Sequence, residues 1–205
     1  MGELVQVSPP RSAGAVADDA RPVDRRRAEA AARDLLGALG VDLSAEDVAD
    51  TPRRVARMYE ELLTSRPFNP TTFANEDRYD ELVIARDIPF VSLCAHHMLP
   101  FHGVVHVGYL PGDRIIGLSK LARVVTYFAR SLQVQERLTK QVADWLDAEL
   151  SPRGAGVVVR ATHQCMTIRG VGAAGSTTVT SAMSGLLREN LSTREEFLAL
   201  CGERS

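Results

Sequence analysis

Residues 154–170 of this 205-residue chain read GAGVVVRATHQCMTIRG and carry the strongest strand pattern in the sequence. Their first half combines β-branched and small residues, a composition that predicts a buried β-strand. The pattern runs directly into His163 and Cys165, and imidazole and thiolate groups are common zinc ligands. The stretch therefore predicts a strand that ends at a chemical site.

Further strands and helices are predicted on both sides of this strand. Stretches rich in β-branched residues predict strands at 81–94, at 102–119 with a turn at 111–113, and at 177–182. Helix-forming composition and apolar spacing predict helices at about 119–131 and 133–149, and an N-terminal pair at 25–40 and 51–63. Strands that enclose two helices behind a helical arm indicate an α+β fold.

The remaining segments set the expected domain boundaries. Residues 1–23 mix Pro, Ala, Gly, Ser, Asp and Arg without periodicity, so we expect a disordered tail. Residues 24–64 form the helical arm, with a short helix at 44–48, and residues 65–205 form the main domain, which opens with a polar loop over 65–78. Thr193 and Glu196 make a capping box, which predicts a last short helix.

Charge and hydropathy exclude several classes of protein. The net charge of -2 gives no electrostatic basis for a nucleic-acid partner or a membrane surface. No apolar run is long enough to span a bilayer, and the N-terminus lacks the apolar core of a signal peptide. Three cysteines, two of them beside histidines, are typical of intracellular thiols rather than of a disulfide framework, so we expect a cytoplasmic protein.

A second group of metal-binding side chains lies upstream, in SLCAHHMLPFHG at 92–103. Cys94 and His97 have the Cys-x-x-His spacing of a two-ligand unit, and His163 and Cys165 have His-x-Cys spacing. A lone cysteine or histidine is more often part of a core, but two such groups, each after a predicted strand, favour a zinc site. Two thiolates and one imidazole leave one zinc position open for water, as in catalytic sites.

The histidines leave two kinds of zinc site open. With three protein ligands, two further histidines remain for proton transfer and the zinc is catalytic. With a fourth ligand from His96, His163 or His102, the site is closed and the zinc is structural. Metal removal distinguishes the two, because loss of a structural zinc unfolds the protein.

Cationic residues are candidates for binding an anion. GLSKLAR, at 117–123, places Ser119, Lys120 and Arg123 in the first turn of a predicted helix, where backbone N–H groups also attract anions. Arg54 begins the helix predicted at 51–63, and Arg169 lies four residues beyond the last cysteine of the metal motif. Each alone is more simply a solvated charge, except Arg169 because it is close to a proposed ligand.

Gln135 and Glu136 lie in LQVQERLTKQ, at 132–141, within a predicted helix. Glu136 is a candidate buried carboxylate for a substrate, or else an exposed residue paired with Lys140 at i,i+4. Spacing alone favours the exposed pair.

Taken together, six segments resemble GTP cyclohydrolase I in their order and spacing. They are TPRRVARMY, SLCAHHMLPFHG, GLSKLAR, QVQERLTKQ, THQCMTIRGV and STTVTSA, and the resemblance covers roughly residues 26–200. It implies a tunnelling fold (T-fold), an antiparallel sheet with two helices packed on it plus a helical N-terminal arm, with 65–205 as the catalytic domain. It also implies a homodecamer with active sites at subunit interfaces.

The reaction that the resemblance implies converts GTP and water to 7,8-dihydroneopterin triphosphate and formate, the first step of tetrahydrofolate biosynthesis. The implied cofactor is Zn²⁺, with the ligands Cys94, His97 and Cys165. The implied catalytic residues are His96, His163, which would protonate the purine N7, and Ser119 at the ribose hydroxyls. The implied GTP-binding residues are Gln135 and Glu136 at the guanine, and Lys120, Arg123, Arg169 and Arg54 at the triphosphate.

Two positions depart from the family pattern. Ala95 stands where the first motif usually has Glu, and Arg160 stands where the strand before the second motif usually has an acidic residue; residues 172–174 replace a stretch that is usually more basic. An acidic residue beside ligands orients them, and losing it costs on the order of 10- to 100-fold in metal affinity or activity. The departures leave two alternatives, an enzyme that stops at a ring-opened intermediate or makes an altered pterin, and a non-catalytic zinc- and GTP-binding partner of an active paralogue.

Overall fold

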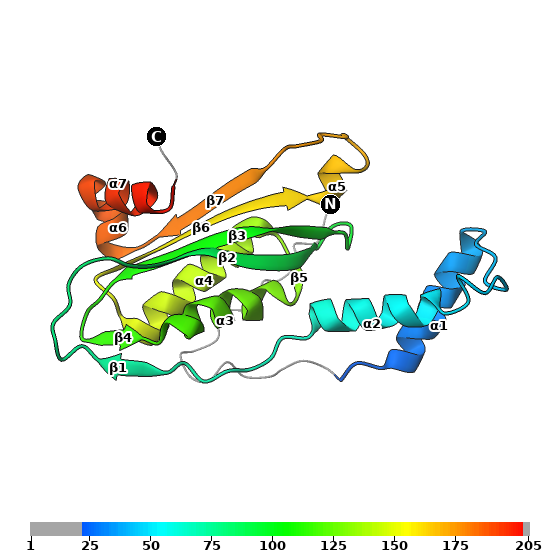
Figure 1. The fold of residues 1–205 in the computed structure, drawn as a ribbon, viewed down its shortest axis with the longest axis horizontal. Helices are drawn as coiled ribbons and strands as arrows, with labels where there is room; N and C mark the ends of the chain where they lie inside the picture. Colours follow the sequence, from blue (N-terminus) through cyan, green and yellow to red (C-terminus); the bar gives the residue numbers. More distant parts are fainter. Residues whose placement is uncertain (1–21, 203–205) are drawn as a thin grey trace, which may run out of the picture.

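The computed structural model describes residues 22–202 and contains a five-stranded sheet with helices on both faces (Figure 1). The strands of this sheet are β2 Val83–Cys94, β3 Pro100–Leu110, β5 Leu132–Gln133, β6 Gly154–His163 and β7 Thr178–Met183. They lie in the order β5-β2-β3-β6-β7, and every pair is antiparallel except the short pair of β2 with β5. The predicted antiparallel sheet is confirmed.

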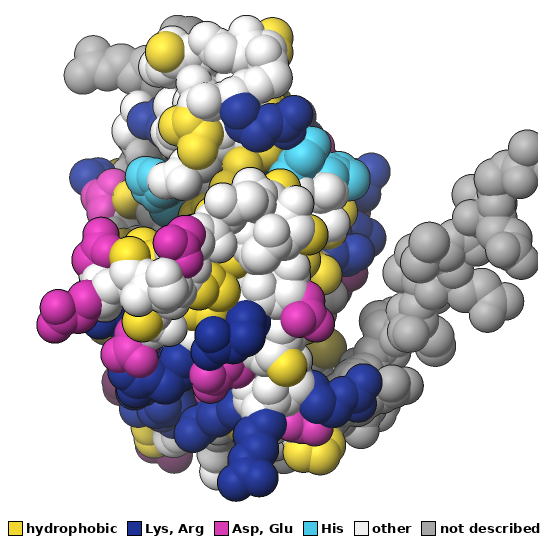
Figure 2. Space-filling model, turned by 90° about the vertical axis from the view of Figure 1, so that its right-hand side faces the viewer, with side chains coloured by type: hydrophobic (Ala, Val, Ile, Leu, Met, Phe, Trp, Pro, Cys, Tyr) yellow, Lys and Arg dark blue, Asp and Glu magenta, His cyan; other side chains and the backbone are white. Residues whose placement is uncertain are grey.

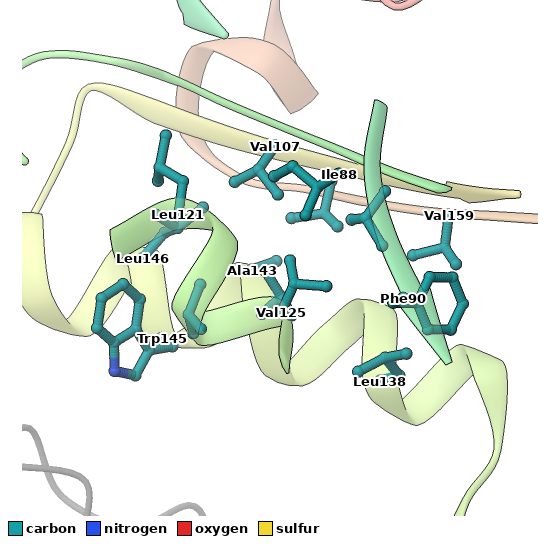
Figure 3. Packing of buried hydrophobic residues seen from close by; sticks show 14 of the residues in the cluster. Ile88, Phe90, Val107, Leu121, Val125, Leu138, Ala143, Trp145, Leu146 and Val159 are labelled. Atoms are coloured by element: carbon teal, nitrogen blue, oxygen red, sulfur yellow. The ribbon is translucent and has the colours of Figure 1, made fainter. Parts of the chain in front are cut away.

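Two helices, α3 Leu118–Ala129 and α4 Gln135–Leu150, cover one face of the sheet and enclose the main core (Figure 3). Leu121 and Val125 of α3 and Leu138 and Leu146 of α4 are completely buried there. They pack against sheet residues that include Val107 and Val159. This confirms the predicted α+β arrangement of two helices packed on an antiparallel sheet.

The opposite face is covered by two short C-terminal helices, α6 Gly185–Glu189 and α7 Leu191–Leu200 (Figure 1). Successive side chains of a strand point to opposite faces. Val157 and Val159 accordingly join the core under α3 and α4, while Val158 joins a second cluster with Leu187 and Phe197. Because β6 is buried on both faces, its sequence is a continuous apolar run rather than an alternating one.

A pair of glycines gives the Phe197 ring of α7 its place against the sheet. Gly108 of β3 and Gly156 of β6 lie opposite each other in register. A Cβ atom at either position would lie 2.8 Å from a carbon of the Phe197 ring. The absence of side chains at both positions therefore allows the ring to contact the strands directly.

The N-terminal arm consists of α1 Arg25–Ala38 and α2 Thr51–Leu63, which lie to one side of the sheet (Figure 1). Asp24 caps α1 by accepting from the Arg27 N–H, and Arg25 pairs with Glu60 of α2 at 2.6 Å. Both helices occupy the predicted ranges. Most of the predicted disordered tail, residues 1–21, lies outside the described residues.

Three segments differ from the sequence prediction. The predicted loop at 65–78 contains β1 Thr72–Ala74, which pairs with β4 Arg114–Ile116 and so satisfies its backbone groups in a second, two-stranded sheet. Residues 44–48 form turns, not a helix. The last helix begins before Thr193, because the Asn190 side chain accepts from the Thr193 N–H and is the stronger cap.

No membrane-spanning helix is found within 22–202, where every helix is too short or too polar to cross a bilayer.

Candidate active site

The first metal-binding motif forms a tight turn at the end of β2. Cys94 is the last residue of the strand, and its carbonyl accepts from the Met98 N–H at 2.8 Å, while its own N–H donates to the Leu99 carbonyl at 2.9 Å. Met98 closes the turn with φ of 55°, in the left-handed region. The turn holds His97 beside Cys94.

The second motif lies at the end of β6, two strands away. His163 is the last residue of this strand, and the one-turn helix α5 Gln164–Thr167 carries Cys165. Phe101 of the intervening strand β3 pairs with Ser92 of β2 on one side and with His163 on the other. The sheet register therefore brings the two motifs to the same edge of the molecule.

The two cysteines and His97 form a three-donor cluster. The Cys94 and Cys165 sulfurs are 3.8 Å apart, and all three ligand atoms lie within 4.8 Å of one another. Two thiolates each about 2.3 Å from one tetrahedral zinc are separated by about 3.8 Å, so the spacing fits that metal. Within residues 22–202, no fourth histidine, cysteine or carboxylate joins the cluster.

The electrostatics of the cluster make metal binding depend on pH. Burial and the adjacent Cys94 sulfur raise the pKa of the Cys165 thiol, and the charge of Arg169 opposes this. A metal must displace the thiol proton, so its affinity falls as the pH falls. The His96 ring is also close, with Nδ1 3.8 Å from the Cys94 sulfur, and its side chain is exposed.

His163 lies beside the cluster in a defined orientation. Its ring is stacked on Phe101 with a centroid separation of 4.5 Å and an interplanar angle of 3°. Its Nε2 atom is 2.8 Å from the Gln135 side-chain oxygen. Burial lowers the pKa of His163, and the charge of Glu136 partly opposes this.

Gln135 and Glu136 begin α4, but they have different surroundings. The Gln135 side chain is buried, whereas Glu136 is exposed in the first turn of the helix. Lys140 pairs with Asp144 at 2.7 Å. Glu136 is therefore exposed but does not pair with Lys140, and its carboxylate lies beside His163.

A basic groove of about 1180 Å³ lies between α2 and α3. Its charged lining consists of the arginines Arg25, Arg54, Arg57, Arg66, Arg123 and Arg130 and the glutamates Glu60 and Glu61. Figure 2 views the end of the molecule that carries the arm and shows Lys and Arg side chains gathered on its lower part. The groove is therefore suited to a polyanion.

Two hydrogen bonds fix α2, which forms one wall of this groove. The Arg130 guanidinium donates to the Glu61 carbonyl at 2.7 Å and ties α2 to α3. The Tyr59 hydroxyl donates to the Met98 carbonyl at 3.3 Å and ties α2 to the turn that carries Cys94 and His97. The position of the groove wall is therefore coupled to that of the metal cluster.

The structure brings together some of the sequence-predicted residues and not others. It gathers the three proposed ligands with His96 and His163, and it places Arg54 and Arg123 on one groove. Ser119 and Lys120 lie in the first turn of α3, and Arg169 lies beyond α5; neither Lys120 nor Arg169 lines the groove.

Several arginines that line the groove were not predicted from the sequence. Arg57 follows Arg54 at i+3 on α2, so helical spacing alone would have placed both on one face. Arg66 and Arg130 carried no such indication, because they reach the groove from a loop and from the end of α3.

The α+β chain thus carries, at one end of its sheet, a Cys–His–Cys cluster that could hold a metal ion, beside a stacked histidine. Residues 28–202 match the profile of the family described as GTP cyclohydrolase I. The chain belongs to this enzyme family, and its sheet and helices are those of the tunnelling fold.

Relatives support the assignment over most of the chain. A GTP cyclohydrolase 1 of Aquifex aeolicus is 48% identical over 178 residues, covering 87% of this chain and 97% of that protein. A GTP cyclohydrolase 1 of Mycolicibacterium paratuberculosis is 49% identical over 185 residues, covering 88% of this chain and 91% of that protein. A solved structure of an apo archaeosine synthase QueF-like protein matches 51% of this chain and 93% of its own with 19% identity and a TM-score of 0.40, too low to add to the assignment.

Proposed function

We propose that this protein is a zinc-dependent GTP cyclohydrolase that converts GTP and water to 7,8-dihydroneopterin triphosphate and formate, a first step toward tetrahydrofolate or another pterin. The observation that carries the proposal is the Cys94–His97–Cys165 cluster, with the sulfur spacing of a tetrahedral zinc site, in a chain of this family. The relatives named GTP cyclohydrolase 1 support GTP as the substrate.

The cluster would hold zinc through the two cysteine sulfurs and the His97 imidazole. Zinc held there would supply Lewis acidity, which lowers the pKa of a water molecule far below its value in bulk water. A catalytic role is favoured over a structural one, because the described residues offer three donors and structural sites usually have four.

We assign the proton transfers to the histidines around the cluster. Guanine C8 is a poor electrophile until N7 is protonated, and His163, stacked on Phe101 and bonded to Gln135, is the proposed donor of that proton. His96 is assigned to the later proton transfers that open and reclose the rings, with Ser119 at the ribose hydroxyls. These steps explain why the site needs more than one acid–base group.

We assign guanine recognition to Glu136. An ionised carboxylate only accepts hydrogen bonds, so it complements the guanine N1–H and 2-amino donors. Its exposed position beside His163 in the first turn of α4 would put the purine next to the proposed acid.

We assign the triphosphate to the cations, namely Arg54 and Arg123 of the groove with Lys120 and Arg169. The triphosphate does not react, so this clamp contributes binding energy that orients the purine at the metal cluster. Arg57 joins the clamp, because it lines the same groove and has no acidic partner among residues 22–202.

Arg57→Ala is expected to raise the KM for GTP by about tenfold, the loss typical of one charged hydrogen bond, with kcat nearly unchanged. The matched control is Arg53→Ala, because Arg53 lies on the same helix, is paired with Asp50 at 2.6 Å and does not line the groove. Steady-state kinetics of both variants check this. An equal rise in KM for the two would contradict a specific role for the groove.

We propose that the active site is completed by residues from more than one chain. The groove lining includes Arg54 and Arg123 but not Lys120, Arg169 or the metal cluster. We propose a homodecamer with active sites at subunit interfaces, as the family resemblance implies. In each subunit, residues 24–64 would form a helical arm and residues 65–205 the catalytic domain.

The test of the proposed function is incubation of the pure protein with GTP and zinc, with formate and dihydroneopterin triphosphate measured separately. We expect both products in equal amounts, and we expect chelation to stop turnover while the circular dichroism spectrum is retained. A protein that forms neither product with any divalent metal would contradict the proposal and favour a non-catalytic GTP-binding partner of an active paralogue.

Ala95 supports one alternative that the same assay resolves. Its N–H donates to the Gln133 carbonyl at 2.8 Å, and its methyl group offers no acceptor to orient His96 or His97. An enzyme impaired in this way could stop at a ring-opened intermediate. Formate without the pterin product would favour this alternative.

A further inference from the structure

The Gln135 side chain is buried yet has a full set of polar partners. Only 1% of the residue is exposed, and the side chain lies at the start of α4 between β6 and β7. Its amide nitrogen contacts the Val159 carbonyl at 3.0 Å, the Thr178 carbonyl at 3.0 Å and the Thr180 hydroxyl at 3.1 Å. Its amide oxygen contacts His163 Nε2 at 2.8 Å.

The chemistry of these partners fixes which way the amide faces. Backbone carbonyl oxygens only accept, so the Gln135 NH₂ group must face Val159 and Thr178. The hydroxyls agree with this orientation. The Thr139 hydroxyl donates to the main-chain carbonyl of Gln135. The Thr180 hydroxyl must therefore donate to Thr139 across their 2.6 Å contact. The Thr180 oxygen can then only accept from the side-chain amide of Gln135.

The orientation of the amide determines the tautomer of His163. The Gln135 oxygen can only accept, so the hydrogen of their 2.8 Å bond must be on His163 Nε2. Stacking on Phe101 holds the imidazole plane parallel to the phenyl ring and resists rotation out of this bond. The Nδ1 atom is then the one ring nitrogen free to exchange a proton with another molecule.

We propose that Gln135 is a positioning residue that holds His163 as the Nε2–H tautomer, so that Nδ1 alone transfers the proton to the substrate. In that step the Nδ1–H bond of the imidazolium breaks, the proton bonds to the purine nitrogen, and the neutral imidazole keeps its Nε2–H on Gln135. The inference rests on the proposed function for the identity of the substrate. It also means that the Gln135 side chain binds His163 and does not bind the guanine.

Neutron diffraction from crystals of the metal-loaded wild-type protein tests the tautomer independently of activity. We expect deuterium on His163 Nε2, directed at the Gln135 oxygen. A bare Nε2 would overturn the proposal.

Kinetics of Gln135→Leu test whether the residue acts through His163. We expect kcat to fall by about 10- to 100-fold, part of the total effect of a general acid, with an unchanged Kd for GTP measured by equilibrium dialysis. Gln133→Leu is the matched control, because Gln133 is also a buried glutamine whose amide donates to a carbonyl, that of Phe128, at 2.8 Å.

The decisive comparison is a double-mutant cycle. In a His163→Ala background, Gln135→Leu should cost no further activity, since the two residues act as a unit. Additive losses, or a weaker Kd for GTP, would overturn the positioning role and favour direct contact with the substrate. If His163→Ala alone retained full turnover, the proton-donor role in the proposed function would fail, whereas the neutron result would still decide the tautomer.

Discussion

Cys165→Ala should lower GTP turnover by at least about 10³-fold, because metal Lewis acidity contributes several kcal/mol and each 1.36 kcal/mol is a factor of ten in rate. Cys165 supplies one of the three donors of the cluster, and its sulfur lies 3.8 Å from that of Cys94. With one sulfur removed, the two remaining donors are too few to hold zinc tightly. The variant should still fold, since Cys165 is only partly buried at the edge of the main core.

The matched control for this prediction is Cys201→Ala, which removes a thiol from the second apolar cluster under α7. Zinc content per subunit, turnover and circular dichroism should be measured for both variants and the wild type. We expect zinc loss and inactivity for Cys165→Ala alone. A folded Cys165→Ala protein that retained stoichiometric zinc and activity would contradict the assignment of the ligands.

His163→Ala should lower kcat by about 10²- to 10⁴-fold, the usual contribution of a general acid or base. The Kd for GTP should change little, because binding is assigned to Glu136 and the cations. The ring stacks on Phe101 and extends to Gln135, so its removal leaves a small cavity but no broken strand.

The control for His163→Ala is His102→Ala, because His102 is an exposed histidine on β3 that pairs with Thr162, next to His163, and is outside the metal cluster. Rapid-quench measurement of a single turnover distinguishes loss of chemistry from slow product release. A fall in activity of the same size for both variants would show that the effect is not specific to the proposed proton donor.

The strands and helices that pack into the core were predictable from the sequence, because burial imposes local patterns. The run of valines in β6 and the apolar spacing along α4 are such patterns. The strand β1 was missed, since its three residues form a strand only by pairing with β4, about 40 residues away. The start of α7 was misplaced because two possible caps lie close together and the asparagine prevails.

The gathering of Cys94, His97 and Cys165 was predictable because each motif is short and follows a strand. The division of the residues into ligands and acid–base groups rests on the family resemblance and stays a prediction. The groove and the surroundings of Gln135 were not predictable. The first depends on how α2 packs beside α3, and the second on the register that sets Val159 and Thr178 around one amide. Such arrangements depend on tertiary packing, which spacing along the chain does not encode.

The opposed glycines Gly108 and Gly156 beneath Phe197 imply that residues on the two strands and on the last helix can be substituted only together. A methyl group on either strand would meet the aromatic ring, so a bulkier residue there is tolerated only with a smaller one on the last helix. Among homologous sequences, loss of this aromatic residue should therefore accompany alanine or serine at position 108. A substitution at position 156 also needs a smaller residue in place of Leu187, whose side chain would lie 2.7 Å from the added Cβ atom. Where the ring is kept, both strands should keep their glycines, whatever chemistry the other edge of the sheet performs.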